Sequence, residues 1–312
     1  MSQRMQWTTK SIPPQDNKVM IVTGANAGLG RATARALAAA GAEVVMAVRS
    51  VEKGEAAADE LRAGPPGAKL HVMPLDLSRL ESVRAFADAF ASSFGRLDGL
   101  INNAGIYDGG SSTTEEGFAL QMGVNHLGHF ALTGLLLPRL LATPGSRVAT
   151  LSSGLYRRST LALDSFHAVE VAHKNGYGRS KLANMLFATE LQQRLERVNA
   201  ETISIAVGPG PTKSEGAREG IGSLSNRLVR GAVDLLTNHI MSSPEDGAKP
   251  SVRAVTDPEA KGGDYFVPGG FLNMWGAPLA TAPRLTVEQT SLSRGLWDRS
   301  AELTGVSYGA LE

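Results

Sequence analysis

Short apolar runs alternate with longer stretches of helical period along most of the chain. From residue 18, the β-branched runs KVMIVTG, AEVVMAV and KLHVMPL are each followed by an Ala- and Leu-rich stretch, and the alternation continues through LDGLINNA, SRVATLSS and ETISIAVGP. Repeated strand–helix units of this kind build a parallel sheet covered on both faces. We therefore predict an α/β fold with a doubly wound, mostly parallel sheet of about seven strands and helices on both faces.

The intervening helices are expected at residues 28–40, 51–63, 78–94, 115–141 and 177–198, and GDYFVPGG provides a last strand. Residues 210–255 read as weak helices without a clear strand. We expect residues 1–17 to form an N-terminal leader on the surface and residues 18–312 to form a single domain. Within it, 210–255 is interpreted as a substrate-covering lid, although its apolar residues suit an ordinary packed helix equally well.

The composition excludes several classes of partner and chemistry. Lys and Arg total 31 against 30 Asp and Glu, so no overall field attracts nucleic acid or an anionic membrane. The absence of Cys excludes disulfides, thiolate metal sites and a cysteine nucleophile. The N-terminus does not resemble a secretory signal, and FALTGLLLPRLLA is too short to span a bilayer. We expect a cytoplasmic protein with no membrane span.

A glycine-rich segment, TGANAGLG, follows the first predicted strand and opens the first predicted helix. In that context Gly24 permits a tight turn, Gly28 lets the backbone approach a ligand, and Gly30 allows close helix–strand packing. The free N–H groups at the helix start can then bind a pyrophosphate. The alternative is a glycine-rich turn without a ligand.

Three further strand ends carry residues suited to a dinucleotide. Arg49 stands where a carboxylate would bind the ribose of NAD, and an Arg suits a 2′-phosphate, so NADP(H) is favoured and NAD(H) is the alternative. Asp76 follows the third strand, where it can accept from an adenine amino group or help to cap a helix. NNAG, at residues 102–105, suits either close cofactor contact or a turn.

Tyr177 and Lys181 are four residues apart at the head of a predicted helix, and so lie on one face with Cβ atoms roughly 6 Å apart. At about 5 Å, an ammonium stabilises a phenolate by about 0.8 kcal/mol in water and about 3.3 kcal/mol at an effective dielectric near 20. Lys181 therefore lowers the pKa of the phenol usefully only in a cleft. Ser152 or Ser153, at the end of the fifth strand, can hold a substrate oxygen beside the Tyr177 phenol. Asn125 can be a core hydrogen-bonding group or hold a water behind Lys181.

The chain resembles the short-chain dehydrogenase/reductase family over roughly residues 18 to 214. The matching segments, in the family's order, are TGANAGLG, NNAG, NHLGHF, LSSG, YGRSK and PGPTKS. The resemblance implies a Rossmann fold and a catalytic tetrad of Asn125, Ser153, Tyr177 and Lys181. By the family's pattern Tyr177 donates and accepts the proton, Ser153 orients the substrate oxygen, Lys181 holds the nicotinamide ribose and lowers the pKa of Tyr177, and Asn125 positions a relay water.

The resemblance also gives the expected cofactor site, and its finer pattern is most similar to the retinol dehydrogenase-like group. That predicts hydride transfer between NAD(P) and a lipophilic alcohol, aldehyde or ketone, in a homodimer or homotetramer formed through the 115–141 helix and the Tyr177 helix. Where many relatives have His before the Pro-Gly dipeptide, this chain has Gly208. The expected cofactor-binding residues are Gly24, Asn26, Gly28, Leu29, Gly30, Arg49, Asp76, Leu77, Asn103, Ala104, Gly105, Tyr177, Lys181, Pro209, Gly210, Thr212 and Ser214.

Two other functions deserve comparison. A serine hydrolase would need a G-x-S-x-G elbow, and Ser153 lies instead in LSSGL. A non-catalytic NADP-binding regulator or scaffold would not need the Tyr, Lys, Ser and Asn set. The histidines at positions 126, 129, 167 and 173 lack metal-ligand spacing, so we expect no metal and interpret them as packing or surface residues.

Overall fold

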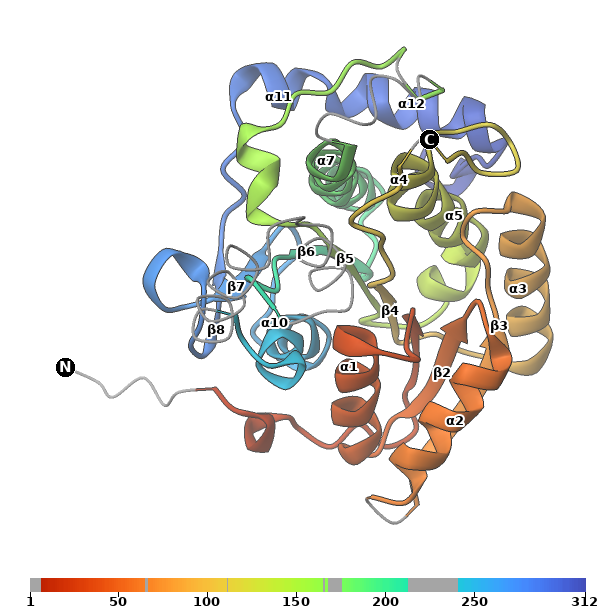
Figure 1. Ribbon diagram of the computed structural model, residues 1–312, viewed down its shortest axis with the longest axis vertical. Coiled ribbons are helices and arrows are strands. Elements are labelled where there is room, and N and C mark those ends of the chain that lie inside the picture. Colours follow the sequence, from red (N-terminus) through yellow and green to blue (C-terminus); the bar gives the residue numbers. More distant parts are fainter. Residues whose placement is uncertain (1–6, 65–66, 111, 165, 168–175, 213–240) are drawn as a thin grey trace, which may run out of the picture.

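A single eight-stranded sheet runs through the protein (Figure 1). The computed structural model describes residues 7–64, 67–110, 112–164, 166–167, 176–212 and 241–312. The strand order is β3-β2-β1-β4-β5-β6-β7-β8, with every neighbouring pair parallel except β7 and β8. The strands are β1 (Val19–Thr23), β2 (Glu43–Val48), β3 (Lys69–Pro74), β4 (Gly99–Asn102), β5 (Arg147–Leu151), β6 (Ile203–Val207), β7 (Tyr265–Pro268) and β8 (Pro278–Thr281).

Helices cover both faces of this sheet, so the predicted doubly wound α/β fold is confirmed (Figure 1). Short 3-10 turns lie at η1 (Thr9–Ser11), η3 (Gly154–Arg158), η4 (Phe271–Asn273) and η5 (Gly309–Leu311), and η2 (Gly123–Leu127) is a π-helical turn. The α-helices are α1 (Gly28–Ala39), α2 (Val51–Arg62), α3 (Leu80–Ser93), α4 (Leu120–Met122), α5 (Gly128–Leu141), α7 (Gly176–Arg197), α10 (Pro244–Thr256), α11 (Val287–Ser291) and α12 (Ser293–Thr304).

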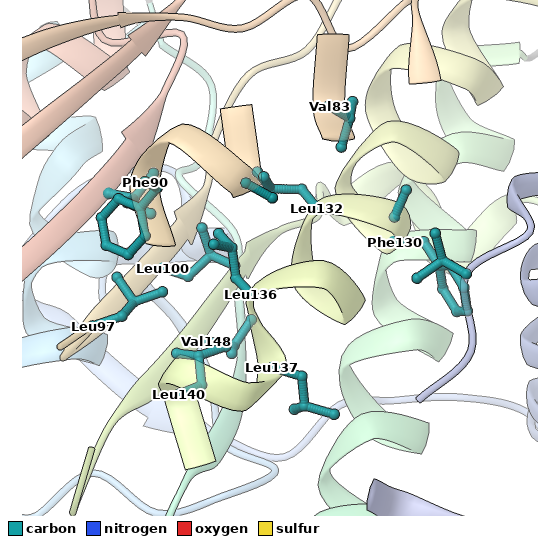
Figure 2. Packing of buried hydrophobic residues seen from close by; sticks show 14 of the residues in the cluster. Val83, Phe90, Leu97, Leu100, Phe130, Leu132, Leu136, Leu137, Leu140 and Val148 are labelled. Carbon is teal, nitrogen blue, oxygen red and sulfur yellow. The ribbon is translucent and has the colours of Figure 1, made fainter. Parts of the chain in front are cut away.

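Two large apolar clusters lie on opposite faces of the sheet. One joins the sheet to α1, α2 and α10, and the other joins it to α3, α5, α7 and α12. The strands are buried from both sides, which explains why they read as continuous apolar runs in the sequence. Figure 2 shows part of the second cluster, where side chains of α3 and α5 meet those of β4 and β5, among them Val83, Phe90, Leu100, Leu132, Leu136 and Val148.

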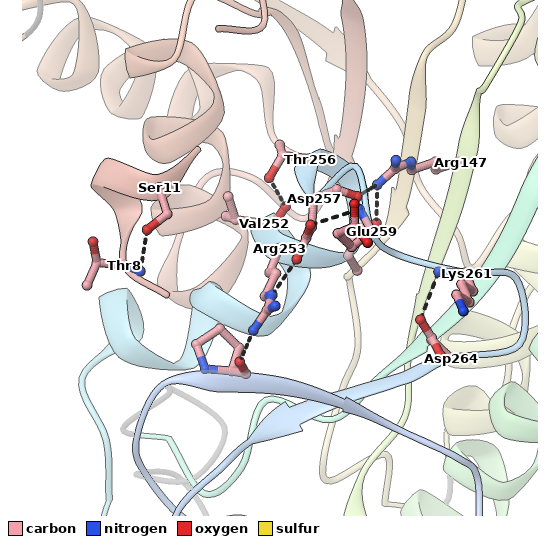
Figure 3. Close-up of polar contacts among 12 residues, drawn as sticks. Thr8, Ser11, Arg147, Val252, Arg253, Thr256, Asp257, Glu259, Lys261 and Asp264 are labelled. Carbon is pink, nitrogen blue, oxygen red and sulfur yellow. Dashed lines mark hydrogen bonds and ion pairs between the residues drawn. The ribbon is translucent and has the colours of Figure 1, made fainter. Parts of the chain in front are cut away.

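The prediction of helix within residues 210–255 is confirmed for 244–255, where α10 forms, although α10 is a well-defined amphipathic helix rather than a weak one. Ser243 caps its start by accepting from the Asp246 N–H at 3.1 Å. Near its other end, the Arg147 guanidinium donates to the carbonyls of Ala254 and Asp257 at 3.1 and 2.7 Å (Figure 3). Arg253 pairs with the Asp257 carboxylate at 2.7 Å. Residues 213–240, which hold most of the proposed lid, lie outside the described residues.

The sheet has one strand more than the seven expected. β8 follows the predicted last strand and pairs antiparallel with β7, placing Pro278 opposite Pro268. Two of the four β8 residues are exposed, which is why PLAT gives no apolar run in the sequence. Proline lacks an N–H donor and is tolerated in a sheet mainly at an edge, where β8 lies.

The single helix predicted over 115–141 is divided into three parts. It begins at Leu120 with α4, passes through the π-helical turn η2, and continues as α5. Before it, Thr113 and Ala119 form an isolated antiparallel bridge. A π-helical turn inserts a residue without changing the apolar character of a segment, so periodicity does not reveal it.

Both ends of the described chain pack onto this domain. Trp7 is buried in the α1 and α10 cluster, with Arg253 over its ring at 5.9 Å. At the other end, α12 lies over α5 and α7 (Figure 1): Trp297 stacks on Phe187 with ring centroids 5.8 Å apart and meets Phe130 edge-on at 5.3 Å.

The strand order changes direction between β1 and β4, since the chain runs outward through β2 and β3 and then returns to the far side of β1. In open α/β sheets such a switch point opens a crevice at the carboxyl ends of the strands, where ligands bind. The glycine-rich segment follows β1 and the NNAG turn follows β4, so both lie at the carboxyl ends of the two strands that flank this switch point.

Candidate active site

The glycine-rich turn leaves the N-terminus of α1 open. A Cβ on Gly30 would stand 2.3 Å from the Gly24 carbonyl oxygen, so the turn can close only with glycine there. By contrast, a Cβ on Gly28, where φ is +52°, would meet nothing within 4 Å. The helix has no side-chain cap at Ala27 and no acidic residue in its first turn. An open, uncapped helix start fits the pyrophosphate of a dinucleotide.

Other predicted cofactor residues surround this turn. Leu29 is half-buried against the position of Gly247, and Asn26 is half-buried. Arg49 is exposed just beyond β2, and within the described part of the chain it has no ion-pair or hydrogen-bond partner. A free guanidinium at this strand end fits the 2′-phosphate of NADP(H).

Asp76 is engaged by its own turn. One carboxylate oxygen accepts from the backbone N–H and the hydroxyl of Ser78, at 2.9 and 2.6 Å. The alternative in which Asp76 or Ser78 caps the helix is wrong, because α3 starts after Arg79; Asp76 holds the preceding turn instead. The Leu77 side chain is buried in the core cluster, and its carbonyl oxygen lies against Gly128.

The NNAG turn is held by Thr23, the last residue of β1. The Thr23 hydroxyl oxygen accepts from the backbone N–H groups of Asn103 and Ala104, both at 2.9 Å. The Asn103 side-chain amide donates to the Thr23 carbonyl at 2.7 Å. Asn103 therefore fixes the turn through its side chain, whereas Gly105 is exposed at the edge of the site.

Tyr177 lies at the start of α7 and Ser153 follows β5, and their side chains are close enough that Ser153 lowers the pKa of the phenol. The phenol is partly buried, and the centroid of its ring lies 4.8 Å from that of the Tyr107 ring. Burial raises the pKa of Tyr177 to about 12, with a smaller rise from Tyr107 and an opposing effect of Ser153. At neutral pH Tyr177 is therefore a protonated donor.

The two serines that end β5 have different surroundings. The Ser152 hydroxyl is buried and donates to the Lys181 carbonyl at 2.8 Å, so it ties β5 to the backbone of α7. The Ser153 hydroxyl, half-exposed, faces Tyr177 and accepts from the Leu155 N–H at 3.4 Å. Ser153 is thus the serine placed to meet a substrate oxygen.

Lys181 lies one helical turn below Tyr177, with Nζ 5.4 Å from the centre of the phenol ring. It is buried and donates to the Leu151 carbonyl at 3.1 Å. Desolvation lowers the pKa of Lys181 to about 8. The two residues share a face as expected, but the pKa of Tyr177 is raised rather than lowered, because desolvation of the phenol is the largest influence on it.

Asn125 lies in the π-helical turn η2 and its side chain joins three segments. The side-chain oxygen Oδ1 accepts from the Ile106 N–H at 2.8 Å. The side-chain nitrogen Nδ2 donates to the Ile106 carbonyl at 3.0 Å and to the Ser180 hydroxyl at 2.9 Å. Asn125 is therefore a core hydrogen-bonding group that binds the NNAG segment to α7. A Cβ on Gly105 would lie 3.3 Å from Asn125 Oδ1 and 3.4 Å from Lys181 Nζ.

The segment after β6 borders the same edge. Pro209 and Gly210 are half-buried, with Gly210 at φ +73°, and buried Thr212 pairs with Ser242 in an isolated parallel bridge. Ser214 lies outside the described residues. These residues place the backbone after β6 close to α1, because Thr212 and Leu29 both pack on Gly247.

Two buried polar residues escaped the sequence prediction as site residues. His129 is buried and bonds both Thr23 and Asn125, rather than being a simple packing residue. The buried Ser180 receives the Asn125 amide. The spacing of Asn125 and His129 in NHLGHF, one helical turn apart, was the available signal.

Comparison with known proteins agrees with this geometry. The sequence model of the short chain dehydrogenase family matches residues 18–221. The chain belongs to the short-chain dehydrogenase family. This short-chain dehydrogenase is therefore an NAD(P)-dependent oxidoreductase that acts on CH–OH groups and their carbonyl counterparts.

Similar proteins cover nearly the whole of this short-chain dehydrogenase. Retinol dehydrogenase 14 of Homo sapiens is 39% identical in an alignment of length 305 that covers 93% of this chain and 87% of the relative. Polyprenol dehydrogenase of Mus musculus is 37% identical in an alignment of length 303 that covers 96% of this chain and 87% of the relative. A crystal structure of an uncharacterised Mycobacterium paratuberculosis protein matches with a TM-score of 0.76 and 32% identity, covering 97% of this chain and 99% of that one.

Proposed function

We propose that this short-chain dehydrogenase uses NADP(H) to interconvert a lipophilic alcohol with its aldehyde or ketone. The observation that carries the proposal is that Tyr177 lies beside Ser153, with Lys181 one turn below, at the sheet edge that also holds the open start of α1. A proton donor, an oxygen-binding hydroxyl and a dinucleotide cradle are the parts that reversible carbonyl reduction requires.

In carbonyl reduction, the Ser153 hydroxyl donates to the carbonyl oxygen and orients it toward Tyr177. Tyr177 then gives its phenolic proton to that oxygen as the alcohol forms, and takes it back in the reverse direction. A nicotinamide cofactor, when bound, would supply or accept the hydride. A phenol with a pKa near 12 is fully protonated at neutral pH, which suits the donor role in reduction.

Lys181 stabilises the phenolate that Tyr177 leaves behind. Its ammonium is desolvated, so its field on the phenolate is stronger than a surface lysine could give. Besides the Leu151 carbonyl, Lys181 Nζ has two further N–H donors for the nicotinamide ribose. Asn125 holds the Ile106 backbone and the start of α7 in place, and we assign a relay water to it as well.

Apolar side chains around Tyr177 support a lipophilic substrate. Tyr107 is 52% exposed and flanks the Tyr177 ring, and Leu155 is 47% exposed and follows Ser153 by two residues. Exposed apolar groups beside a reacting hydroxyl favour a substrate that buries them. Relatives named retinol and polyprenol dehydrogenases carry names of lipophilic alcohols.

NADP(H) is favoured over NAD(H) because Arg49, and no carboxylate, follows β2. The cofactor would lie against the residues that surround the α1 turn, the NNAG turn and the segment after β6. We assign it Gly24, Asn26, Gly28, Leu29, Gly30, Arg49, Asp76, Leu77, Asn103, Ala104, Gly105, Tyr177, Lys181, Pro209, Gly210, Thr212 and Ser214.

The cellular setting is also a proposal. Among the described residues, each helix is too short or too polar to cross a bilayer, and we propose a cytoplasmic enzyme. For assembly we propose a homodimer or homotetramer. Since α12 packs over both α5 and α7, a contact on that side has to involve α12. We also propose that residues 1–17 form a leader and that a substrate-covering lid lies within 210–255 ahead of α10, which packs into the core beside α1.

The experiment compares the wild type with Tyr177→Phe in nucleotide-dependent turnover of retinal, medium-chain aldehydes and small charged sugars. Tyr107→Phe is the matched control, because it removes a phenolic hydroxyl from the neighbouring ring. We expect Tyr177→Phe to lose at least about 10²-fold in kcat, as loss of a general acid does, while Tyr107→Phe keeps its rate. Undiminished turnover in Tyr177→Phe, or preference for the sugars, contradicts the proposal.

A further inference from the structure

His129 joins the end of β1 to Asn125. Its Nδ1 lies 3.0 Å from the backbone carbonyl oxygen of Asn125, and its Nε2 lies 2.9 Å from the Thr23 hydroxyl oxygen. All three residues are buried, with at most 1% exposure. Thr23 in turn holds the NNAG turn, so one chain of hydrogen bonds runs from the cofactor turn to the π-helical turn.

The Asn125 backbone carbonyl, at one end of this series of hydrogen bonds, fixes the donor and the acceptor in every bond of the series. A backbone carbonyl can only accept, so His129 carries its proton on Nδ1. Burial lowers the pKa of His129 to about 3, so Nε2 keeps a free lone pair. Nε2 must then accept, and the single Thr23 hydroxyl proton points at it. The Thr23 oxygen is left to accept from the Asn103 and Ala104 N–H groups.

A buried imidazole with both nitrogens engaged does more than fill space. An apolar residue of similar volume would pack as well among α5 and β1, but it would leave the Thr23 hydroxyl to the longer contact with the Ile101 carbonyl, at 3.3 Å. It would also leave the Asn125 carbonyl without a side-chain donor. The titratable groups close to His129 are Lys181 and the neighbouring His126, and both lower the pKa of His129.

We propose that His129 is a positioning residue of this dehydrogenase, which sets the Asn125 backbone against the NNAG turn. The consequence reaches the reacting groups, because Asn125 Oδ1 and Lys181 Nζ both lie within 3.4 Å of the point where a Gly105 Cβ would stand. A shift of the Asn125 backbone would also displace the Asn125 side chain from its hydrogen bonds to Ile106 and Ser180, which fix this part of the site. His129 acts through Asn125 and touches no substrate.

Two substitutions separate the two ends of the imidazole. In His129→Asn the amide nitrogen takes the place of Nδ1 and can still donate to the Asn125 carbonyl. In His129→Gln the longer amide reaches the place of Nε2 and can accept from Thr23, but no longer serves Asn125. We expect His129→Asn to keep kcat within about threefold of the wild type, and His129→Gln and His129→Leu to lose about tenfold or more.

The Thr23 end has its own control, Thr23→Val, which removes the hydroxyl and keeps the shape. We expect it to weaken NADPH binding, measured by titration without substrate, because the NNAG backbone loses its acceptor. Equal kcat for folded His129→Asn and His129→Gln, with equal melting temperatures, would show that the imidazole only packs and would overturn the proposal.

A spectroscopic test uses the wild type without nucleotide. Nitrogen-15 spectra of the histidine side chains, with His129 assigned by the missing signal in His129→Gln, should show a neutral ring protonated on Nδ1 from about pH 5 to about pH 8. A proton on Nε2 refutes the hydrogen-bond polarity. The kinetic test rests on the proposed function and this one does not. A failed Tyr177→Phe prediction with the Nδ1–H tautomer present would therefore count against the reaction scheme alone.

Discussion

The hydroxyl of Tyr265 occupies the space that a side chain at position 208 would need. A Cβ on Gly208 would stand 2.2 Å from the Tyr265 hydroxyl oxygen and 2.8 Å from the ring carbon that bears it. The Tyr265 ring is buried and meets Tyr156 edge-on, with centroids 5.9 Å apart. A histidine before the Pro-Gly dipeptide would not fit here unless Tyr265 moved.

Gly208→Ala should therefore destabilise the protein by about 1–3 kcal/mol, the usual cost of overpacking a rigid site. Urea or thermal unfolding measures it. Tyr265→Phe in the same chain should recover part of the loss, since it removes the atom in closest contact. Gly95→Ala is the control, because a Cβ there meets nothing within 4 Å. Equal destabilisation by both alanines would show that Tyr265 is not the cause.

Ser152 and Ser153 should respond differently to alanine. Ser153→Ala removes the hydroxyl that faces Tyr177 and should lower kcat by about 10²-fold with little change in melting temperature. Ser152→Ala removes a buried donor from the Lys181 carbonyl and should cost about 1 kcal/mol of folding free energy. Steady-state kinetics and thermal melts on the two variants test this, and the reverse pattern would reassign the catalytic serine.

Arg49→Ala should weaken NADPH selectively. Loss of a charge-assisted contact to the 2′-phosphate predicts about a tenfold higher KM for NADPH and an unchanged KM for NADH. Arg299→Ala is the charge-matched control, since Arg299 pairs with Glu302 on α12. If both nucleotides are affected alike, Arg49 does not recognise the 2′-phosphate.

The stability of the wild type relative to Lys181→Met should rise with pH above about 8. Burial lowers the pKa of Lys181 from 10.5 to about 8, so between those values the unfolded chain binds the proton and the folded protein does not. Stability increases with pH wherever the unfolded state binds more protons. The gain should be on the order of 3 kcal/mol across the window. A pH-independent difference in unfolding free energy between the two proteins would show that the Lys181 pKa is not lowered.

Most of the fold was predictable because its strands are buried on both faces. The first six strands and the helices between them lie within a few residues of their predicted positions, since apolar runs and helical period report burial directly. β8 was missed because it is short and half exposed. The π-helical turn at Asn125 was missed because its residues are as apolar as those of a regular helix.

The site was predictable only as a set of residue types. Tyr177 and Lys181 are neighbours on one helix, so their relation follows from spacing. Thr23 and His129 are 106 positions apart, and their contact depends on how α5 packs on β1. The pKa of Tyr177 was expected to fall and instead rises, because the phenol is desolvated by burial, which no spacing reveals.

The two edges of the sheet have a consequence for behaviour at high concentration. β3, at one edge, starts with Lys69 and ends with Pro74, and β8, at the other, is four residues long and starts with Pro278. Charged, short and proline-bearing edges are poor templates for strand addition by another molecule. Aggregation through edge-to-edge pairing should therefore be disfavoured while the fold is intact, so aggregation should follow unfolding rather than precede it.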